Sequence, residues 1–355
     1  MKKIKWDKDL LITYGIVVVF YIVMQSLKLG GGLSSLFKGL LVPLCVYMIM
    51  AVSLNLTVGI MGELSLGHAG FMCIGAFSSA FFSMCMKETI TNSLLRFIIA
   101  IIIGALMAAV FGFLIGIPVL RLRGDYLAIV TLAFGEIIKN IINAMYVGKD
   151  SNGIHVSLKD SASLGLEEGG TVIINGAQGI TGTPNDSTFT IGIILLLISL
   201  FVVLNFVKSR SGRAVMAIRD NRIAAESVGI NISKYKLMAF SISASLAGVA
   251  GALYAHNLAT LNALPKNFGY NMSIMILVYV VLGGIGNIRG SYIAAAILTV
   301  LPELLRSFSD YRMLIYSIVL IAMMLFNASP GGMALKEKLN PKKLIAAKKT
   351  AKEVE

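Results

Sequence analysis

The chain has 355 residues, of which 57% are hydrophobic and only 14% are charged, and its formal net charge is +13. Ordinary soluble domains carry about 25% charged residues, so this composition indicates a membrane protein and excludes a soluble nucleic-acid binder as the reason for the positive charge. The three cysteines, Cys45, Cys73 and Cys85, lie in apolar stretches without a C-x-x-C pair, which excludes a disulfide framework and a zinc ribbon.

Ten uncharged apolar runs follow one another along the chain, and a membrane-spanning helix needs about 20 such residues. We therefore predict an all-α polytopic membrane protein with about ten transmembrane helices. The runs are approximately Leu10 to Leu27, Gly39 to Thr57, Leu64 to Met86, Phe97 to Pro118, Tyr126 to Val147, Phe189 to Val207, Leu237 to Leu258, Met272 to Gly284, Ser291 to Leu305 and Met313 to Leu325. The part from 272 to 305 fits either two crossings or one re-entrant hairpin.

Lysine and arginine gather at the N-terminus, in the segment 208–236 and in the tail after Lys336. Cytoplasmic loops accumulate these residues, so we expect all three regions, and with them both termini, to be cytoplasmic. An even number of crossings separates each region from the next, as this orientation requires. The prediction is a transmembrane domain over 1–335, with an external loop at 148–188 and a cytoplasmic loop at 208–236, followed by a basic cytoplasmic tail at 336–355.

Small residues recur every fourth position in two of the runs. Close approach through small side chains is a main source of helix association in lipid, so we predict helix–helix contacts there. The alternative is that a stripe borders a transport pathway or a partner subunit. The three stripes are Gly104, Ala108, Gly112 and Gly116; Ser243, Ala247, Gly251 and Ala255; and Ala244, Gly248 and Ala252.

Glycines interrupt the helical pattern at 59–70 and again at 283–290. Unwound backbone at membrane depth is tolerated only against protein or a water-filled cavity, so such a pair favours discontinuous helices around a site near the middle of the membrane. The other interpretation is two glycine-rich loops at the membrane surface. Candidate residues for the site are Gly62 and Ser65 in the first region and Gly283 and Gly286 in the second.

Ionisable side chains inside the apolar runs need a partner or a wet surface, because a charge in hydrocarbon is costly. Glu136 has Lys139 three residues further on, so the two can neutralise each other on one helical face, either as a polar wall of a conduit or as a contact between helices. His68 and Glu63 lie in the first glycine-broken region, where a packing role and a ligand role are both open. No phosphate-binding loop, zinc-protease motif or nucleophile elbow occurs, and no metal site is predicted.

The segment 208–236 is basic and has the pattern of two short helices. Ser211 is placed to cap the start and Gly229 to end the region, with a break at Asp220 and Asn221. One interpretation is a solvated helix on anionic lipid head groups. The other is a docking element for a cytoplasmic motor protein.

Five stretches, in the same order along the chain, resemble the permeases of branched-chain amino-acid ABC importers. Arg213 to Asn231 is similar to their coupling loop, a variant of the Glu-Ala-Ala loop of bacterial import systems. Leu120 to Glu136 resembles a mark of the larger, M-type subunit. The other three are Leu54 to Gly70, Gly176 to Pro184 and Val281 to Gly290. The long external segment from Gly148 to Thr188 and the lysine-rich tail depart from the pattern.

The resemblance implies a multi-pass permease subunit of the bacterial plasma (inner) membrane that imports leucine, isoleucine or valine. It implies partners: a second homologous permease subunit, two cytoplasmic ATPase subunits and an external substrate-binding protein. ATP would be used by the ATPase subunits, and no cofactor is expected on this chain. The residues expected to couple to the ATPases are Arg213, Arg219, Asp220, Arg222, Ala224, Ala225, Glu226 and Gly229. Those expected along the translocation path are Asn55, Gly62, Ser65, His68, Glu136, Gly283 and Gly286.

Three alternatives stay open at the level of sequence. A permease of the same family could carry a nucleoside, a sugar or urea. A self-sufficient secondary transporter or channel would need no ATPase, although the large basic segment speaks against it. An intramembrane enzyme would need Glu63, His68 and Glu136 to converge on one cavity, and no spacing in the sequence requires that.

Overall fold

The structure is a computed structural model that describes residues 8–32, 34–122, 124–151, 153–167, 169–306 and 311–328. The predicted tail at 336–355 lies outside the described residues. The chain divides into two compact units, 1–297 and 298–355. The second unit holds the end of helix α12 and helix α13, and an ion pair joins Glu303 to Arg306 at 3.0 Å. All the contacts discussed below belong to the first unit.

The described residues are mainly helical. The helices are α1 (Lys8–Leu29), α2 (Ser35–Asn55) with its π-helical continuation η1 (Leu56–Met61), α3 (His68–Cys85), α4 (Ser93–Val119), α5 (Asp125–Ala144), α6 (Phe189–Lys208), α7 (Arg210–Asp220), α8 (Arg222–Ser227), α9 (Ile232–Ala255), α10 (Pro265–Phe268), α11 (Tyr270–Gly283), α12 (Ile288–Leu304) and α13 (Arg312–Ala328). Two 3₁₀ turns, η2 (Ala162–Leu164) and η3 (Gly176–Gln178), lie between α5 and α6.

Each of the ten predicted apolar runs coincides for most of its length with one of these helices, which confirms an all-α polytopic membrane protein. Among the described residues, seven helices are long and apolar enough to cross a bilayer: α1, α2 with η1, α3, α4, α5, α6 and α9. The prediction for α3 began too early, because residues 62–67 are not helical. The shorter α11 and α12 are separate helices joined by a turn at 284–287.

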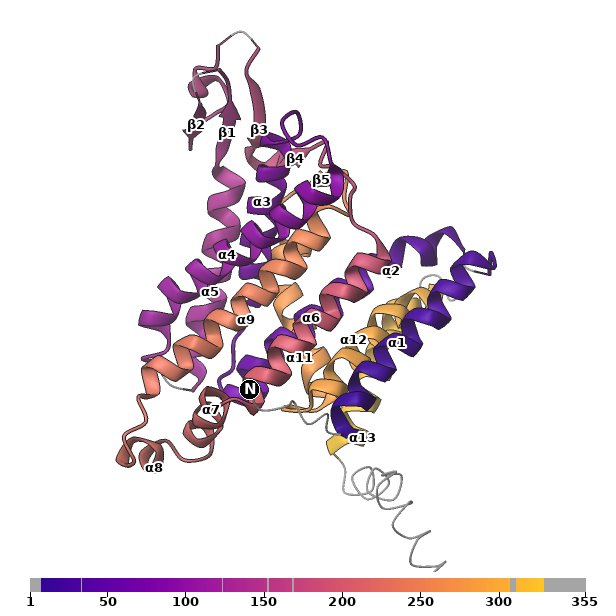
Figure 1. The fold of residues 1–355 in the computed structure, drawn as a ribbon, viewed down its shortest axis with the longest axis vertical. Helices are drawn as coiled ribbons and strands as arrows, with labels where there is room; N and C mark the ends of the chain where they lie inside the picture. Colours follow the sequence, from indigo (N-terminus) through magenta and orange to yellow (C-terminus); the bar gives the residue numbers. More distant parts are fainter. Residues whose placement is uncertain are drawn as a thin grey trace, which may run out of the picture. The chain divides into compact units, whose positions relative to one another are not determined.

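Helix α9 packs against α2, α3 and α4 and forms the centre of the bundle (Figure 1). The predicted small-residue stripes lie at these contacts. A side-chain carbon added to Gly248 would come within 2.5 Å of Ala108 on α4, and one added to Gly251 would lie 2.1 Å from the backbone oxygen of Met72 on α3. The stripes therefore permit helix–helix packing, as predicted.

A small sheet interrupts the helices between α5 and α6, where the sequence predicted only a glycine-rich loop. The strands β1 (Tyr146–Lys149), β2 (Ile154–Ser157) and β3 (Thr171–Asn175) pair antiparallel in the order β2-β1-β3. A second pairing joins β4 (Ile180–Thr181) to β5 (Thr260–Leu261). Within the first unit, the three-stranded sheet lies beyond one end of the helices and α7 and α8 lie at the other (Figure 1).

Candidate functional site

The first glycine-broken region leaves the bundle and turns back into it. The π-helix η1 ends at Gly62, whose left-handed backbone (φ 77°) a residue with a side chain rarely adopts. Residues 63–67 then run without helical structure to the start of α3, where His68 hydrogen-bonds Ser53 of α2 at 2.6 Å. Because Ser53 lies nine residues, about two helical turns, before Gly62, the non-helical segment 63–67 reaches well into the bundle.

The second glycine-broken region reverses the chain between α11 and α12. Gly283 ends α11, and the backbone of Gly284 and Gly286 has φ values of 95° and 82°. A side-chain carbon added to Gly290 would lie 1.7 Å from the backbone oxygen of Gly283, so α12 starts in direct backbone contact with the end of α11. Only glycine at this position allows so tight a reversal.

The two regions meet, although more than 200 residues separate them in sequence. A side-chain carbon added to Gly59 would lie 2.3 Å from the backbone nitrogen of Gly286. Asn55, which is fully buried, accepts a hydrogen bond from the Gly286 backbone at 2.9 Å and donates one to Ser291 at 2.7 Å. We refer to Gly59, Gly62 and Gly286 as the glycine junction.

Arg219, near the end of α7, contacts the glycine junction directly. Its Nη1 donates a hydrogen bond to the backbone oxygen of Gly59 at 2.8 Å. A side-chain carbon added to Gly62 would lie 2.5 Å from Cγ of Arg219, so the aliphatic part of this arginine covers Gly62. The guanidinium also pairs with Asp220 at 2.9 Å. A residue predicted for coupling thus contacts residues predicted for the path.

Helices α7 and α8 have well-defined ends. Ser209 caps α7 by accepting a hydrogen bond from the Gly212 backbone at 3.0 Å, so the sequence prediction of Ser211 as the cap was wrong by two residues. Asn221 caps α8, which confirms the predicted break, and Gly229 ends the region with φ 82°. These local hydrogen bonds fix where each of the two helices begins.

One face of this pair of helices is buried and the other is free. Ile218 of α7, Ala225 of α8 and Ile232 of α9 form a small apolar cluster. On the opposite side, two large apolar residues of the α8 region, Ile223 and Val228, are strongly exposed. The remaining residues predicted for coupling are exposed or half-buried: Arg213, Arg222, Ala224 and Glu226. An exposed apolar pair among charged residues is typical of a docking surface.

A buried ion pair joins the non-helical segment 63–67 to α9. Lys236 of α9 bonds Glu63, which directly follows Gly62, and both side chains are mostly buried. The sequence contained no signal for this contact, because the two residues are far apart and a basic residue in a basic segment looks ordinary. Because each charge neutralises the other, neither is left unpaired in a low-dielectric region, where an unpaired charge would be strongly destabilising.

Both carboxylate oxygens of Glu136 are bonded to other parts of the protein. It pairs with Lys139, as predicted, and its other oxygen accepts a hydrogen bond from the backbone nitrogen of Tyr270 at 2.8 Å. Glu136 therefore caps the first turn of α11, where a negative charge is favourable. Nearby, Ser273 of α11 accepts a hydrogen bond from the Ala69 backbone at 3.1 Å, so α3 and α11 begin side by side.

Six of the seven predicted path residues fall into two groups, and the seventh, Glu136, lies on α5 against the start of α11. Asn55, Gly62, Gly283 and Gly286 lie at or next to the glycine junction, at the end of the bundle that carries α7. His68 and Ser65 lie deeper, with Ser65 buried and its hydroxyl unbonded within the described part of the chain. Residues 63–67 are non-helical, and the glycine junction joins the two broken regions. The choice between a site near the middle of the membrane and loops at its surface stays a prediction.

The three residues of the enzyme alternative have separate partners. Glu63 bonds Lys236, His68 bonds Ser53, and Glu136 bonds Lys139 and the start of α11. Each therefore has a structural role, and no contact links the three of them in the described residues. The geometry gives no support to a shared catalytic centre.

Comparison with known proteins gives one family over most of the chain. Residues 36–328 match the family described as branched-chain amino acid transport system, permease component. The chain is 38% identical over 79% of its length to the high-affinity branched-chain amino acid transport system permease protein LivM of Escherichia coli, and 37% identical to LivM of Salmonella typhimurium. It spans 66% of the length of these relatives.

A more distant similarity, 27% identity over 46% of this chain and 50% of the relative, is to the autoinducer 2 import system permease protein LsrC of Yersinia enterocolitica. No solved structure matches the chain.

Proposed function

The chain belongs to the family of permease components of branched-chain amino-acid transport systems, and we propose that it is a path-forming subunit of an ATP-driven importer for leucine, isoleucine and valine. It is a multi-pass protein of the bacterial plasma membrane. On this proposal the chain is not an enzyme. Separate ATPase subunits bind and hydrolyse ATP, and an external binding protein delivers the substrate.

The observation that carries the proposal is the contact of Arg219 with the glycine junction. An ATPase that binds α7 and α8 can drive transport only if the two states of the motor favour different states of the membrane helices. Arg219 bonds the backbone of Gly59, and Gly59 lies against the backbone of Gly286. A displacement of α7 would therefore act on both broken helices through one point.

The glycine junction suits this role because it joins segments that can change direction. Hinges are a few residues at the ends of elements that absorb a change in backbone angles. Gly62 and Gly286 are such residues, and Asn55 holds the two breaks together through its hydrogen bonds to Gly286 and Ser291. In the proposed mechanism α7 moves this junction as a unit and thereby tilts α11 and the start of α12.

The proposed docking site for the ATPase is the exposed surface formed by α8 and by Val228, the residue that follows it. Ile223 and Val228 would enter an apolar pocket on the ATPase surface, and Arg222 and Glu226 would form a polar rim around them. On this proposal α7 and α8, with the whole segment 208–236, are cytoplasmic. The three-stranded sheet then faces the outside, where the binding protein arrives.

The substrate proposal rests on the family and on the side chains available along the path. A branched aliphatic side chain offers no charge, so an apolar path lined by small residues is sufficient, with the binding protein setting selectivity. Three ion pairs with largely buried side chains lie in the described part of the bundle: Glu63 with Lys236, Glu136 with Lys139, and Arg96 with Asp186. They are therefore unsuited to select a charged substrate side chain.

The experiment is uptake by the complete complex, purified with its companion subunits and placed in liposomes with ATP inside. We expect uptake of labelled leucine that depends on the binding protein and is displaced by unlabelled isoleucine and valine. Competition by adenosine, ribose or urea, with none by valine, would overturn the substrate assignment. Unchanged uptake without ATP would overturn the proposed energy source.

A further inference from the structure

A long apolar groove runs between α4 and α5. Two hollows, of about 380 and 580 Å³, lie along it and share Phe111 as a wall. We refer to it as the α4–α5 groove. It is defined by Met107, Phe111 and Leu114 on α4 and by Val130, Phe134 and Ile141 on α5. From Val130 to Met145 it follows α5 for about 22 Å at 1.5 Å per residue, most of the roughly 30 Å of a bilayer core.

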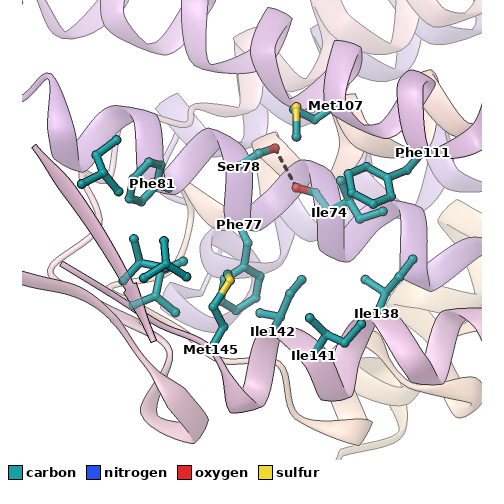
Figure 2. A pocket seen from close by; sticks show the side chains of 14 residues that line it. Ile74, Phe77, Ser78, Phe81, Met107, Phe111, Ile138, Ile141, Ile142 and Met145 are labelled. Atoms are coloured by element: carbon teal, nitrogen blue, oxygen red, sulfur yellow. Dashed lines mark hydrogen bonds between the residues drawn. The ribbon is translucent and has the colours of Figure 1, made fainter. Parts of the chain in front are cut away.

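The lining offers nothing to a polar ligand. Figure 2 shows Met107 and Phe111 across the hollow from Ile138 and Ile141. The polar side chain in this lining is Ser78, and its hydroxyl is already bonded to the backbone oxygen of Ile74 at 2.7 Å. An occupant must therefore be apolar, which leaves a lipid chain or an apolar protein segment.

The groove continues from the helices onto the small sheet. Ile154 and Val156 of strand β2 line the same hollow as Met107 and Phe111 and lie on one face of the sheet, and Leu158 follows just after the strand; we refer to these three residues as the β2 row. These three side chains are 59%, 63% and 69% exposed. The sheet around them carries the pair His155–Asp150 and the charged Lys149 and Lys159, so this part lies outside the hydrocarbon.

The continuation of the groove onto the sheet favours an apolar protein segment over a lipid chain as its occupant. A lipid chain fills a groove only within the hydrocarbon, so it would leave the β2 row exposed to water at an edge strand, where an apolar row invites pairing with another chain. A soluble binding protein could cover the sheet but could not enter the groove between α4 and α5. A transmembrane helix that continues past the membrane surface covers both.

We propose that the α4–α5 groove and the β2 row together receive one transmembrane helix of the companion permease subunit. This rests on the function proposed above, because a transporter with two permease subunits needs an interface between them. Among the described residues, strand β2 pairs with β1 and is an edge strand of the sheet, so its outer edge can contact the same partner.

The test is photo-crosslinking in membranes that contain the complete complex. The crosslinker p-benzoyl-phenylalanine replaces Val156 or Ile141, and, as a matched control, Ile198 on α6, which is equally exposed and apolar. We expect both groove positions to give an adduct whose peptide, identified by mass spectrometry, belongs to an apolar helix of the companion permease. Position 198 gives no such adduct. An adduct with the binding protein, with lipid or with a second copy of this chain, or no adduct, would overturn the proposal.

A second measurement uses substitution and co-purification. Val156→Glu should reduce the companion permease recovered with the tagged chain by at least fivefold, because a charge would be buried in the contact. Lys159→Glu, a larger change in charge in the same exposed region, should leave recovery unchanged. Equal recovery with both variants would contradict the proposal, and the amount of chain in the membrane shows that each one inserts.

The two proposals can fail separately. If the adducts form as expected but the wild-type complex does not take up leucine, the interface stands and the transport function falls. If the wild-type complex takes up leucine but the crosslinks from Val156 and Ile141 reach no permease subunit, the function stands and the interface falls.

Discussion

The sharpest prediction concerns Arg219→Ala. The change removes the hydrogen bond to Gly59 and uncovers Gly62, but it alters no residue of the bundle. We expect the complex to assemble and hydrolyse ATP while taking up less leucine for each ATP consumed. The physical reason is that the motor would lose the contact through which it acts on both broken helices.

The size of the effect follows from the contact. A hydrogen bond to a charged group contributes about 1.5 to 3 kcal/mol. The Arg219 side chain is 38% exposed and also pairs with Asp220, so water and Asp220 replace part of that contribution. We take about 1 to 2 kcal/mol as the loss in coupling, which corresponds to a fall of about 5- to 30-fold in uptake per ATP.

The assay measures leucine uptake and ATP hydrolysis in the same proteoliposomes. Arg210→Ala is the matched control, because it removes one exposed positive charge at the opposite end of the same helix. Arg219→Lys keeps a donor and should recover part of the coupling. If Arg219→Ala and Arg210→Ala give the same uptake per ATP as the wild type, α7 does not act through this contact.

Three further predictions concern the glycine junction and its surroundings. Gly59→Ala would force its new carbon against Asn55 and the Gly286 backbone, so we expect a loss of about 3 kcal/mol in stability, near the upper end for overpacking. Gly39→Ala is the control, because this glycine has open space around it in α2, and it should leave the unfolding temperature unchanged or raised. Equal unfolding temperatures for the two variants would refute the close contact at Gly59. Asn55→Ala leaves the Gly286 nitrogen unbonded and should lower the free energy of unfolding, measured with denaturant, by about 1 to 3 kcal/mol. Ser291→Ala preserves that bond and should lower it less, so a larger loss for Ser291→Ala than for Asn55→Ala would contradict the role of Asn55. Lys236→Met leaves the charge of Glu63 without its partner and should lower the free energy of unfolding by about 3 to 5 kcal/mol, and adding Glu63→Gln should restore most of that loss. A double variant no more stable than Lys236→Met alone would show that this ion pair does not hold segment 63–67 to α9.

The helices could be predicted because their signal is strong and local. Long uncharged runs indicate membrane helices by composition alone, and small residues at every fourth position indicate where they touch. The same holds for the break at Asn221 and for Gly229, where one residue type determines the local backbone. The cap at Ser209 was missed because Ser211, two positions later, is an equally good capping residue by type.

The contacts that make the site could not be predicted. Asn55 and Gly286 are joined across most of the chain, and nothing in either segment specifies the other. The pairing of Glu63 with Lys236 and the capping of α11 by Glu136 depend in the same way on how the helices assemble. The sheet was missed because its strands are only four or five residues long, too short for a periodic signal.

The glycine motif at 283–290 predicted a break in the helix but not the position of that break in the fold. Its glycines correctly indicated a break, but two interpretations of the break were open. The contact of Gly59 with Gly286, and of Arg219 with Gly59, places this break at the end of the bundle beside α7. That position follows from tertiary structure, which the spacing of glycines does not encode.

The most direct test of the account is the accumulation ratio of leucine in liposomes that contain this chain and its companion permease, measured with and without the ATPase subunits. The account predicts that leucine accumulates against its gradient only when the ATPases and ATP are both present. It further predicts that Val228→Asp, at the exposed residue that follows α8, abolishes this accumulation by preventing docking. Uphill accumulation without the ATPases, driven by an ion gradient, would contradict it.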